Sequence, residues 1–125
     1  MIELRFPRLN IDGAEGSRFD TVTVTVSPKQ FAPPALPFSV SRFEPATQCG
    51  FLHLPVGWVG EQHPSPARMW IYVLQGQMDF EASNGDTRRM IPGSALLLED
   101  TAGRGHSSRV IGDMPAALAA IRLPE

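Results

Sequence analysis

The sequence predicts an all-β protein made of many short strands, with little helix. Polar and apolar residues alternate with a period of two, as in "DTVTVTV" (residues 20–26), where three valines face one way and three threonines the other. Twelve prolines and eleven glycines interrupt the chain too often for long helices. Short strands at even spacing between turns are typical of a sandwich or barrel.

The expected strands follow one another in a regular order. A loose hairpin comes first, with a Gly-rich turn between Leu9 and Phe19. The segment "PAALAAIRLP" near the end contains enough alanine for a short helix, but its length and its place after the other strands favour a closing strand. Turn sequences separate several of the strands, including "QGQ", "SNGD" and "PGS". The strands after the hairpin are expected around 38–43, 48–54, 69–74, 77–82, 87–91, 95–99, 107–111 and 118–123.

The segment "SPKQFAPPALPF" (residues 27–38) holds four prolines, so it can form neither a helix nor a central strand. Because it is also apolar, we expect an extended arm that lies on a protein surface. We expect residues 1–37 to form N-terminal strands and this arm packed on the barrel, and residues 38–125 to form the barrel of one structural domain. The arm either folds back on its own barrel or braces a homodimer through Phe31, Leu36 and Phe38.

Composition excludes several classes of protein. The chain has 125 residues, which corresponds to one domain, and its net charge is −2 with no basic run, so a nucleic-acid-binding role is not expected. Cys49 is the only cysteine, which rules out an internal disulfide or a cysteine cluster for a metal. The N-terminus lacks a signal-type apolar core, and the apolar runs are too short to span a bilayer. The expectation is a soluble cytoplasmic protein.

The segment "GWVGEQHPSPARMWIYVLQG" (residues 57–76) resembles the first motif of the cupin superfamily. That motif has two glycines at its ends and two histidines and a glutamate between them, at fixed spacings. Gly57, His63 and Gly76 keep their positions. Ser65 stands in the position of the second histidine, and Met69 stands in that of the glutamate. Two of the three metal-ligand positions are therefore changed.

The segment "TAGRGHSSRV" (residues 101–110) resembles the latter half of the second cupin motif. Gly103 and His106 occupy its glycine and histidine positions, whereas Thr101 and Val110 replace its proline and asparagine. The resemblance covers roughly residues 38–123. It implies a jelly-roll barrel (a double-stranded β-helix), a fold that is often dimeric in this superfamily.

The resemblance also implies that the motif histidines point into the barrel. Period-two geometry then places Met69, Ile71 and Val73 on the lumen face, with Trp70, Tyr72 and Leu74 on the other. In the same way, Ser108 and Val110 should share the face of His106. The residues expected to bind a ligand in the lumen or at its mouth are His63, Ser65, Met69, Ile71, His106, Ser108, Arg104 and Trp58.

Two imidazoles alone are too few for a transition-metal site, which needs three or four good donors. Glu99 or Asp100 lies just before the second motif and would complete a triad for a divalent metal such as Zn, Ni, Fe or Mn. No cofactor is certain from the sequence. A barrel filled by Met69 and its aliphatic neighbours, with no ligand, is the other interpretation. His53 matches no motif position and is expected to be an ordinary hydrogen-bonded histidine.

Two classes of function remain open. The first is a module that binds a small polar molecule between His63 and His106, with an incomplete metal site. The second is an enzyme. It would be either a metal-dependent oxygenase or isomerase that uses both histidines with Glu99 or Asp100, or a metal-free protein that resembles the sugar epimerases and uses a histidine base. The expected outward position of Tyr72 weakens the epimerase version. The sequence does not identify the ligand or a reaction.

Overall fold

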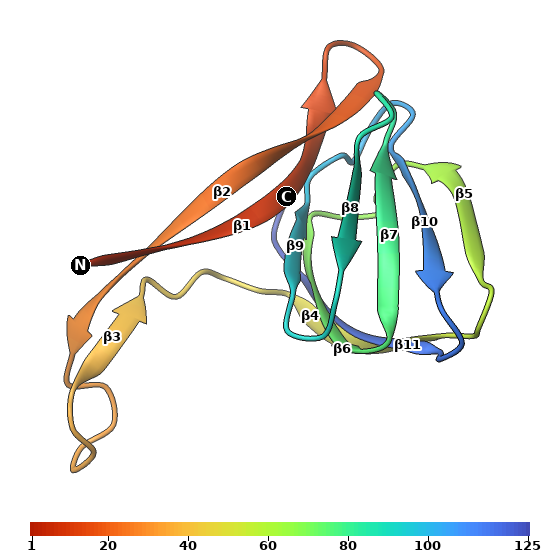
Figure 1. The fold of residues 1–125 in the computed structure, drawn as a ribbon. Coiled ribbons are helices and arrows are strands. Elements are labelled where there is room, and N and C mark those ends of the chain that lie inside the picture. The colour runs from red at the N-terminus through yellow and green to blue at the C-terminus, as the bar shows by residue number, and fades with distance from the viewer.

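The computed structural model describes residues 1–125 and contains eleven β-strands and no helix (Figure 1). No segment therefore forms an apolar helix of the length needed to cross a membrane. The expectation of an all-β fold is confirmed. The strands are β1 (Ile2–Asp12), β2 (Gly16–Lys29), β3 (Phe38–Ser41), β4 (Gln48–Leu54), β5 (Val59–His63), β6 (Met69–Gln75), β7 (Gln77–Ala82), β8 (Thr87–Met90), β9 (Ala95–Leu98), β10 (His106–Ile111) and β11 (Ala116–Arg122).

The strands form two sheets, which face each other and together make the barrel. The larger sheet has the order β3-β2-β1-β9-β6-β11-β4, and the smaller has the order β5-β10-β7-β8. In Figure 1, the strands β9, β6, β11 and β4 of the larger sheet lie opposite the smaller sheet, which gives a jelly roll. The expected closing strand is present as β11, which pairs with β6 on one side and β4 on the other. Strand β5, inside the first motif, was not among the expected strands.

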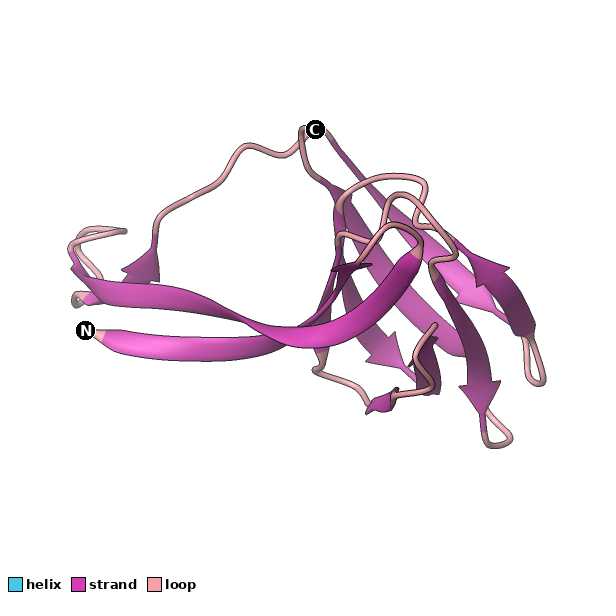
Figure 2. Cartoon of the chain, turned by 90° about the horizontal axis from the view of Figure 1, so that it is seen from above, coloured by secondary structure: helices cyan, strands magenta, loops and turns pink.

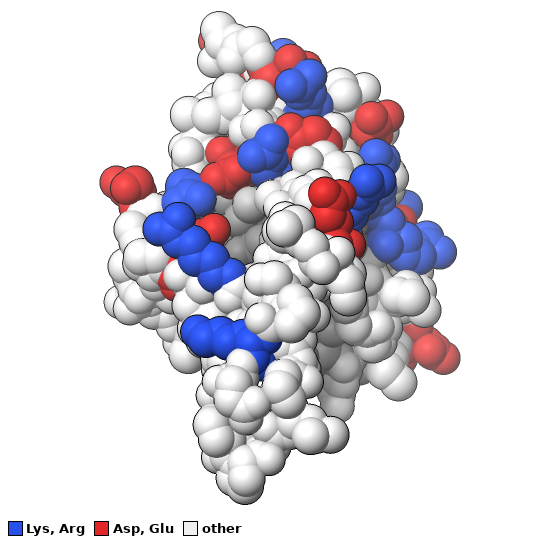
Figure 3. Space-filling model, turned by 90° about the vertical axis from the view of Figure 1, so that its left-hand side faces the viewer, with Lys and Arg blue, Asp and Glu red and all other residues white.

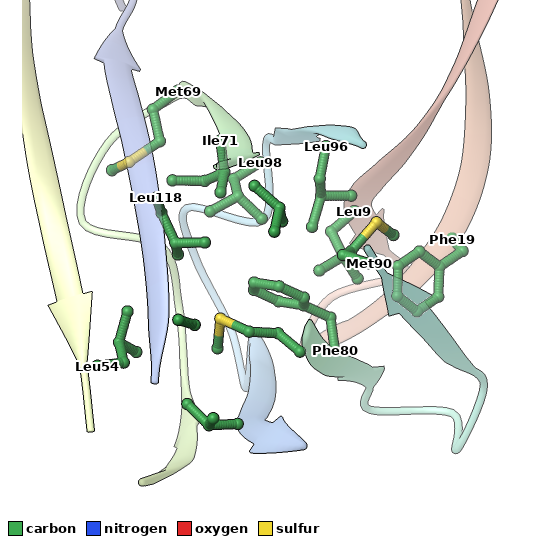
Figure 4. Packing of buried hydrophobic residues seen from close by; sticks show 14 of the residues in the cluster. Leu9, Phe19, Leu54, Met69, Ile71, Phe80, Met90, Leu96, Leu98 and Leu118 are labelled. Carbon is green, nitrogen blue, oxygen red and sulfur yellow. The ribbon is translucent and has the colours of Figure 1, made fainter. Parts of the chain in front are cut away.

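Alternation along β6 sorts its side chains as expected. Met69, Ile71 and Val73 are buried between the sheets, whereas Leu74 is 49% exposed. Met69, Ile71 and Val73 belong to one apolar cluster, which contains residues of both sheets and of the hairpin β1–β2 (Figure 4). In that view, Leu9, Phe19 and Met90 lie together on the hairpin side of the barrel. The cluster fixes how the two sheets face each other.

The turn end of the hairpin β1–β2, which we call the root (residues 8–20), is fastened to the barrel by an ion-pair network. Arg8 donates to Asp20 at 2.7 Å and to Glu99 at 3.0 Å, and Glu99 also accepts from Arg68 at 2.7 Å. The hydrogen bond from Arg8 holds the pKa of Asp20 below its usual value. Backbone pairing of β1 with β9 is confined to Arg8 and Leu9.

The rest of the hairpin projects away from the barrel together with β3 (Figure 2), and we call these residues (1–7 and 21–41) the arm. Strand β3 pairs with β2 and not with a barrel strand, so Phe38–Ser41 lies in the arm although the sequence placed it in the barrel. The Pro-rich segment forms the far end of the arm. There Phe31 lies with its ring centroid 5.6 Å from those of Phe38 and Phe43.

Candidate functional site

A cavity of about 690 Å³ opens between the two sheets, in the part of the barrel that the apolar cluster does not fill. Its volume lies within the range of small-molecule sites, which is roughly 300–1,000 Å³. Val73 and Val110, although expected on the lumen face, lie in the filled part and do not line the cavity. The barrel is thus partly packed and partly hollow, and the two interpretations of the lumen each describe one part.

His63 and His106 stand side by side in the wall of this cavity. They are paired residues of the neighbouring strands β5 and β10, and their ring centroids are 5.2 Å apart with the planes inclined by 48°. Gly105 makes this approach sterically feasible. It has a φ of +69°, and a Cβ at this position would overlap the backbone of His63 and Pro64.

The two imidazoles are oriented through the same ring nitrogen. The Nδ1 of His63 lies 2.7 Å from the carbonyl oxygen of Glu61, and the Nδ1 of His106 lies 2.5 Å from Oδ2 of Asp100. Because carbonyl and carboxylate oxygens accept hydrogen bonds, both Nδ1 atoms carry the proton and donate it. The Nε2 atoms make no hydrogen bond within the chain and are the ring nitrogens left for a ligand.

The position of His106 depends on the residues around its loop. Asp100 is fully buried, and its Oδ1 has no hydrogen-bond partner. Its backbone oxygen accepts from the amide of Ser65 at 2.9 Å, which connects the loop to the first motif. The buried hydroxyl of Ser17 donates to the carbonyl oxygen of Gly105 at 2.6 Å. The root of the hairpin therefore supports the loop that presents His106.

The remaining residues expected at the site differ in what they offer a ligand. Met69, Ile71 and Trp58 line the cavity and contribute apolar surface. Ser65 also lines it, but its hydroxyl donates to the carbonyl oxygen of Ala67 at 2.7 Å. Ser108 lines it too, and its hydroxyl makes no hydrogen bond within the chain. Ser108 is thus the hydroxyl that is available to a ligand.

The donor set does not fit a transition metal. Asp100 binds the Nδ1 of His106, on the side of the ring away from Nε2, so it cannot share a metal with that Nε2. Glu99 does not line the cavity and is held by Arg8 and Arg68. No three His, Cys, Asp or Glu side chains gather as a ligand set. The structure thus places neither carboxylate as the third ligand that the sequence suggested.

Arg104 was expected near the lumen and does not line the cavity. Its backbone amide donates to the carbonyl oxygen of Glu15 at the hairpin turn, and its side chain is exposed. Sequence reasoning missed Arg122 and Gln48, which line the cavity from β11 and β4. The same period-two count that placed Met69 inside would have found Arg122, because it follows Leu118 and Ala120 on the lumen face of the closing strand.

No protein-family model matches the chain, and no curated protein matches it. Several solved structures do. The cupin domain of Cnp3 from Schizosaccharomyces pombe is 16% identical, the match covers 98% of this chain and 84% of that one, and the TM-score is 0.53. The conserved protein SPY1581 of unknown function from Streptococcus pyogenes is 17% identical over 62% of this chain and 64% of its own, with a TM-score of 0.48.

An RmlC-like cupin protein from Desulfovibrio desulfuricans is 18% identical over 59% of this chain and 69% of its own, with a TM-score of 0.46. The match to the Cnp3 domain carries the comparison because it includes the arm as well as the barrel. At these identities the likeness concerns the fold alone. The order of strands in two facing sheets and this likeness agree, and the chain has a cupin-type jelly-roll fold.

Proposed function

We propose that the chain is a binding module that holds a small polar molecule in the barrel cavity, between His63 and His106, without a complete metal site. One observation carries the proposal. Two neighbouring imidazoles in the wall of a cavity of about 690 Å³ are both held through Nδ1, which leaves both Nε2 atoms without a partner. A ligand with two hydrogen-bond donors would satisfy both.

The surroundings of the imidazoles support a ligand with an apolar part as well. Phe80 lies with its ring centroid 5.8 Å from that of His106, and Met69, Ile71 and Leu118 line the cavity beside it. The free hydroxyl of Ser108 adds a group that both donates and accepts. These polar groups are set in a mostly apolar wall, an arrangement typical of small-molecule sites.

A metal-free enzyme is the second candidate, and the Asp100–His106 hydrogen bond favours it. A buried carboxylate on Nδ1 orients an imidazole and stabilises the cation that forms when Nε2 takes a proton. His106 would then act as the base. Tyr72 does not line the cavity, so it supplies no acid there. Because no carboxyl, phenol or ammonium group lines the cavity to serve as a dedicated acid, we place binding before catalysis.

The binding proposal predicts that small polar fragments stabilise the protein through His63. A thermal-shift screen of fragments with two hydrogen-bond donors should give hits, because a ligand that binds only the folded state raises the melting temperature. The dissociation constants of the hits should rise about three- to tenfold in His63→Gln, which loses one hydrogen bond. They should rise further in Ala120→Trp, which fills the cavity.

The matched control is His53→Gln, because His53 is exposed on β4 and does not line the cavity. It should bind every hit as tightly as the unaltered protein does. If no fragment stabilises the protein, or if the hits bind His63→Gln and Ala120→Trp unchanged, the binding proposal is wrong.

The incomplete metal site predicts weak metal binding. Two imidazoles should hold Zn²⁺ only weakly, whereas Ser65→His combined with Met69→Glu restores a four-donor set and should tighten the dissociation constant at least about tenfold. Calorimetric titration of Zn²⁺ into both proteins, with Ser65→His alone as the control, measures this. Tight one-to-one binding by the unaltered protein would show that a donor outside His63 and His106 completes the site.

We also propose that the chain forms a homodimer through the arm. On one face of the hairpin, the side chains of Ile2 and Leu4 are 54% and 43% exposed. The outer edge of β1 is unpaired before Arg8, and such an edge favours pairing with a second chain. Burying a large apolar side chain contributes about 1.5–3 kcal/mol, so an arm left in water is costly.

A second copy of the chain is the partner that we propose for the arm, because the larger sheet has exposed apolar side chains at both of its ends. Strand β4 is the edge at the other end of that sheet, and it exposes Phe51 to 79%, whereas the neighbouring Leu52 lines the cavity. Each chain therefore offers both an apolar arm and an apolar edge, as a symmetric dimer requires. Figure 3 shows the side of the molecule on which the arm lies. No charged side chain is seen in the lowest part of that view, where the end of the arm lies.

The dimer proposal predicts that replacing Phe31 and Phe38 by serine produces monomers. These side chains are 44% and 49% exposed and lie on the arm, so the change should weaken the interface more than the fold. Analytical ultracentrifugation measures the mass, and Met114→Ser, an exposed apolar position outside the arm, is the control. If the unaltered protein is a monomer, the dimer proposal is wrong. If the double serine variant is still a dimer, the arm does not form the interface.

A further inference from the structure

We infer that the ligand of the cavity is an amphipathic organic anion, with an apolar body and one carboxylate- or sulfonate-like group, and that Arg122 binds this group. The inference rests on the proposed binding function and adds the class of ligand. It rests on Arg122 because this is the one arginine in the cavity wall. Arg122 belongs to neither motif.

Arg122 belongs to the cavity through the register of three strands. It follows Leu118 and Ala120 on the lumen face of β11, and all three line the cavity. Its partner across β6 is Met69, and its partner across β4 is Gln48. Arg122 is exposed at the end of this row, whereas Met69 is only 6% exposed. The guanidinium therefore stands where the cavity meets solvent.

The charges around the cavity are unbalanced. No Asp, Glu or Lys lines it, and Arg122 is the one lining residue with a permanent charge. The guanidinium of Arg122 makes neither an ion pair nor a hydrogen bond within the chain, unlike those of Arg8, Arg68, Arg89 and Arg109. The guanidinium groups of Arg18, Arg42 and Arg104 are also unpaired, but they lie outside the cavity. An incoming anion would meet a free cation and no repelling carboxylate.

The chemistry of the wall specifies the rest of the ligand. A guanidinium binds a planar or tetrahedral oxyanion through two parallel hydrogen bonds, which are stronger than those between neutral groups. The side-chain amide of Gln48 lies beside it on the next strand and can donate to the same anion. Beyond this mouth the wall is mostly apolar, and the Nε2 atoms of His63 and His106 accept hydrogen bonds. The matching molecule is anionic at one end, apolar in its body and a donor at the imidazoles.

Two dyes that share one ring system test the inference directly. The anion 1-anilinonaphthalene-8-sulfonate and the neutral N-phenyl-1-naphthylamine differ by the sulfonate, and both fluoresce in apolar sites. The unaltered protein should bind the anion more tightly than the neutral dye. Arg122→Gln should weaken binding of the anion about tenfold or more and leave the neutral dye within about twofold. Arg122 is exposed, so this variant should fold normally.

The controls separate this inference from the binding function on which it rests. Arg104→Gln removes an exposed arginine outside the cavity and should change neither dye. Ala120→Trp should weaken both, and Phe31→Ser with Phe38→Ser should weaken neither, which excludes dye on the arm. If Arg122→Gln leaves the anion unchanged while Ala120→Trp weakens both dyes, the anion inference is wrong and the cavity still binds. If Ala120→Trp changes neither dye, both are wrong.

Discussion

The buried hydrogen bond between Asp100 and His106 is the constraint on which the site depends. A carboxylate without access to water is costly unless a donor compensates it, and Asp100 is 0% exposed. The Nδ1–H of His106 is its only side-chain partner, at 2.5 Å, because Oδ1 has none. This bond fixes the plane of the imidazole. It leaves Nε2, on the opposite side of the ring from Asp100, without a hydrogen-bond partner. It also removes Asp100 from any role as a metal ligand.

The neighbouring residues Glu99 and Asp100 connect the site to the rest of the fold. Successive side chains of an extended segment point to opposite sides, so one carboxylate faces outward and the other inward. Glu99 accepts from Arg8 and Arg68 and fastens the root of the hairpin, while Asp100 holds His106. The root in turn supports the His106 loop through Ser17 and Gly105. The arm and the cavity are thus parts of one connected structure, although the arm projects far from it.

The alternation of polar and apolar residues along the sequence was enough to predict most strands and which of their side chains point inward. It assigned Met69 and Ile71 to the inside and found the closing strand. That His63 and His106 would lie near each other was an implication of the resemblance of two separate segments to family motifs, not of alternation. Strand β5 was missed because "VGEQH" lacks an alternating apolar pattern, and its pairing with β10 is what makes it a strand. The Asp100–His106 bond was missed because it depends on the shape of the loop that joins the two residues, which no local sequence pattern predicts. The sequence also gives no local signal for how far the hairpin extends beyond the barrel.

The protonation and tautomeric state of His63 and His106 can be measured in solution. Long-range nitrogen–proton NMR spectra of the histidine rings report which nitrogen carries the proton, and the shifts of Nε2 report a ligand. We expect the Nδ1–H form for both His63 and His106, and a change in the Nε2 chemical shift of both rings when a cavity ligand is added, with no change at His53. Protonated Nε2 in neutral rings, or a ligand that shifts neither ring, would contradict this expectation.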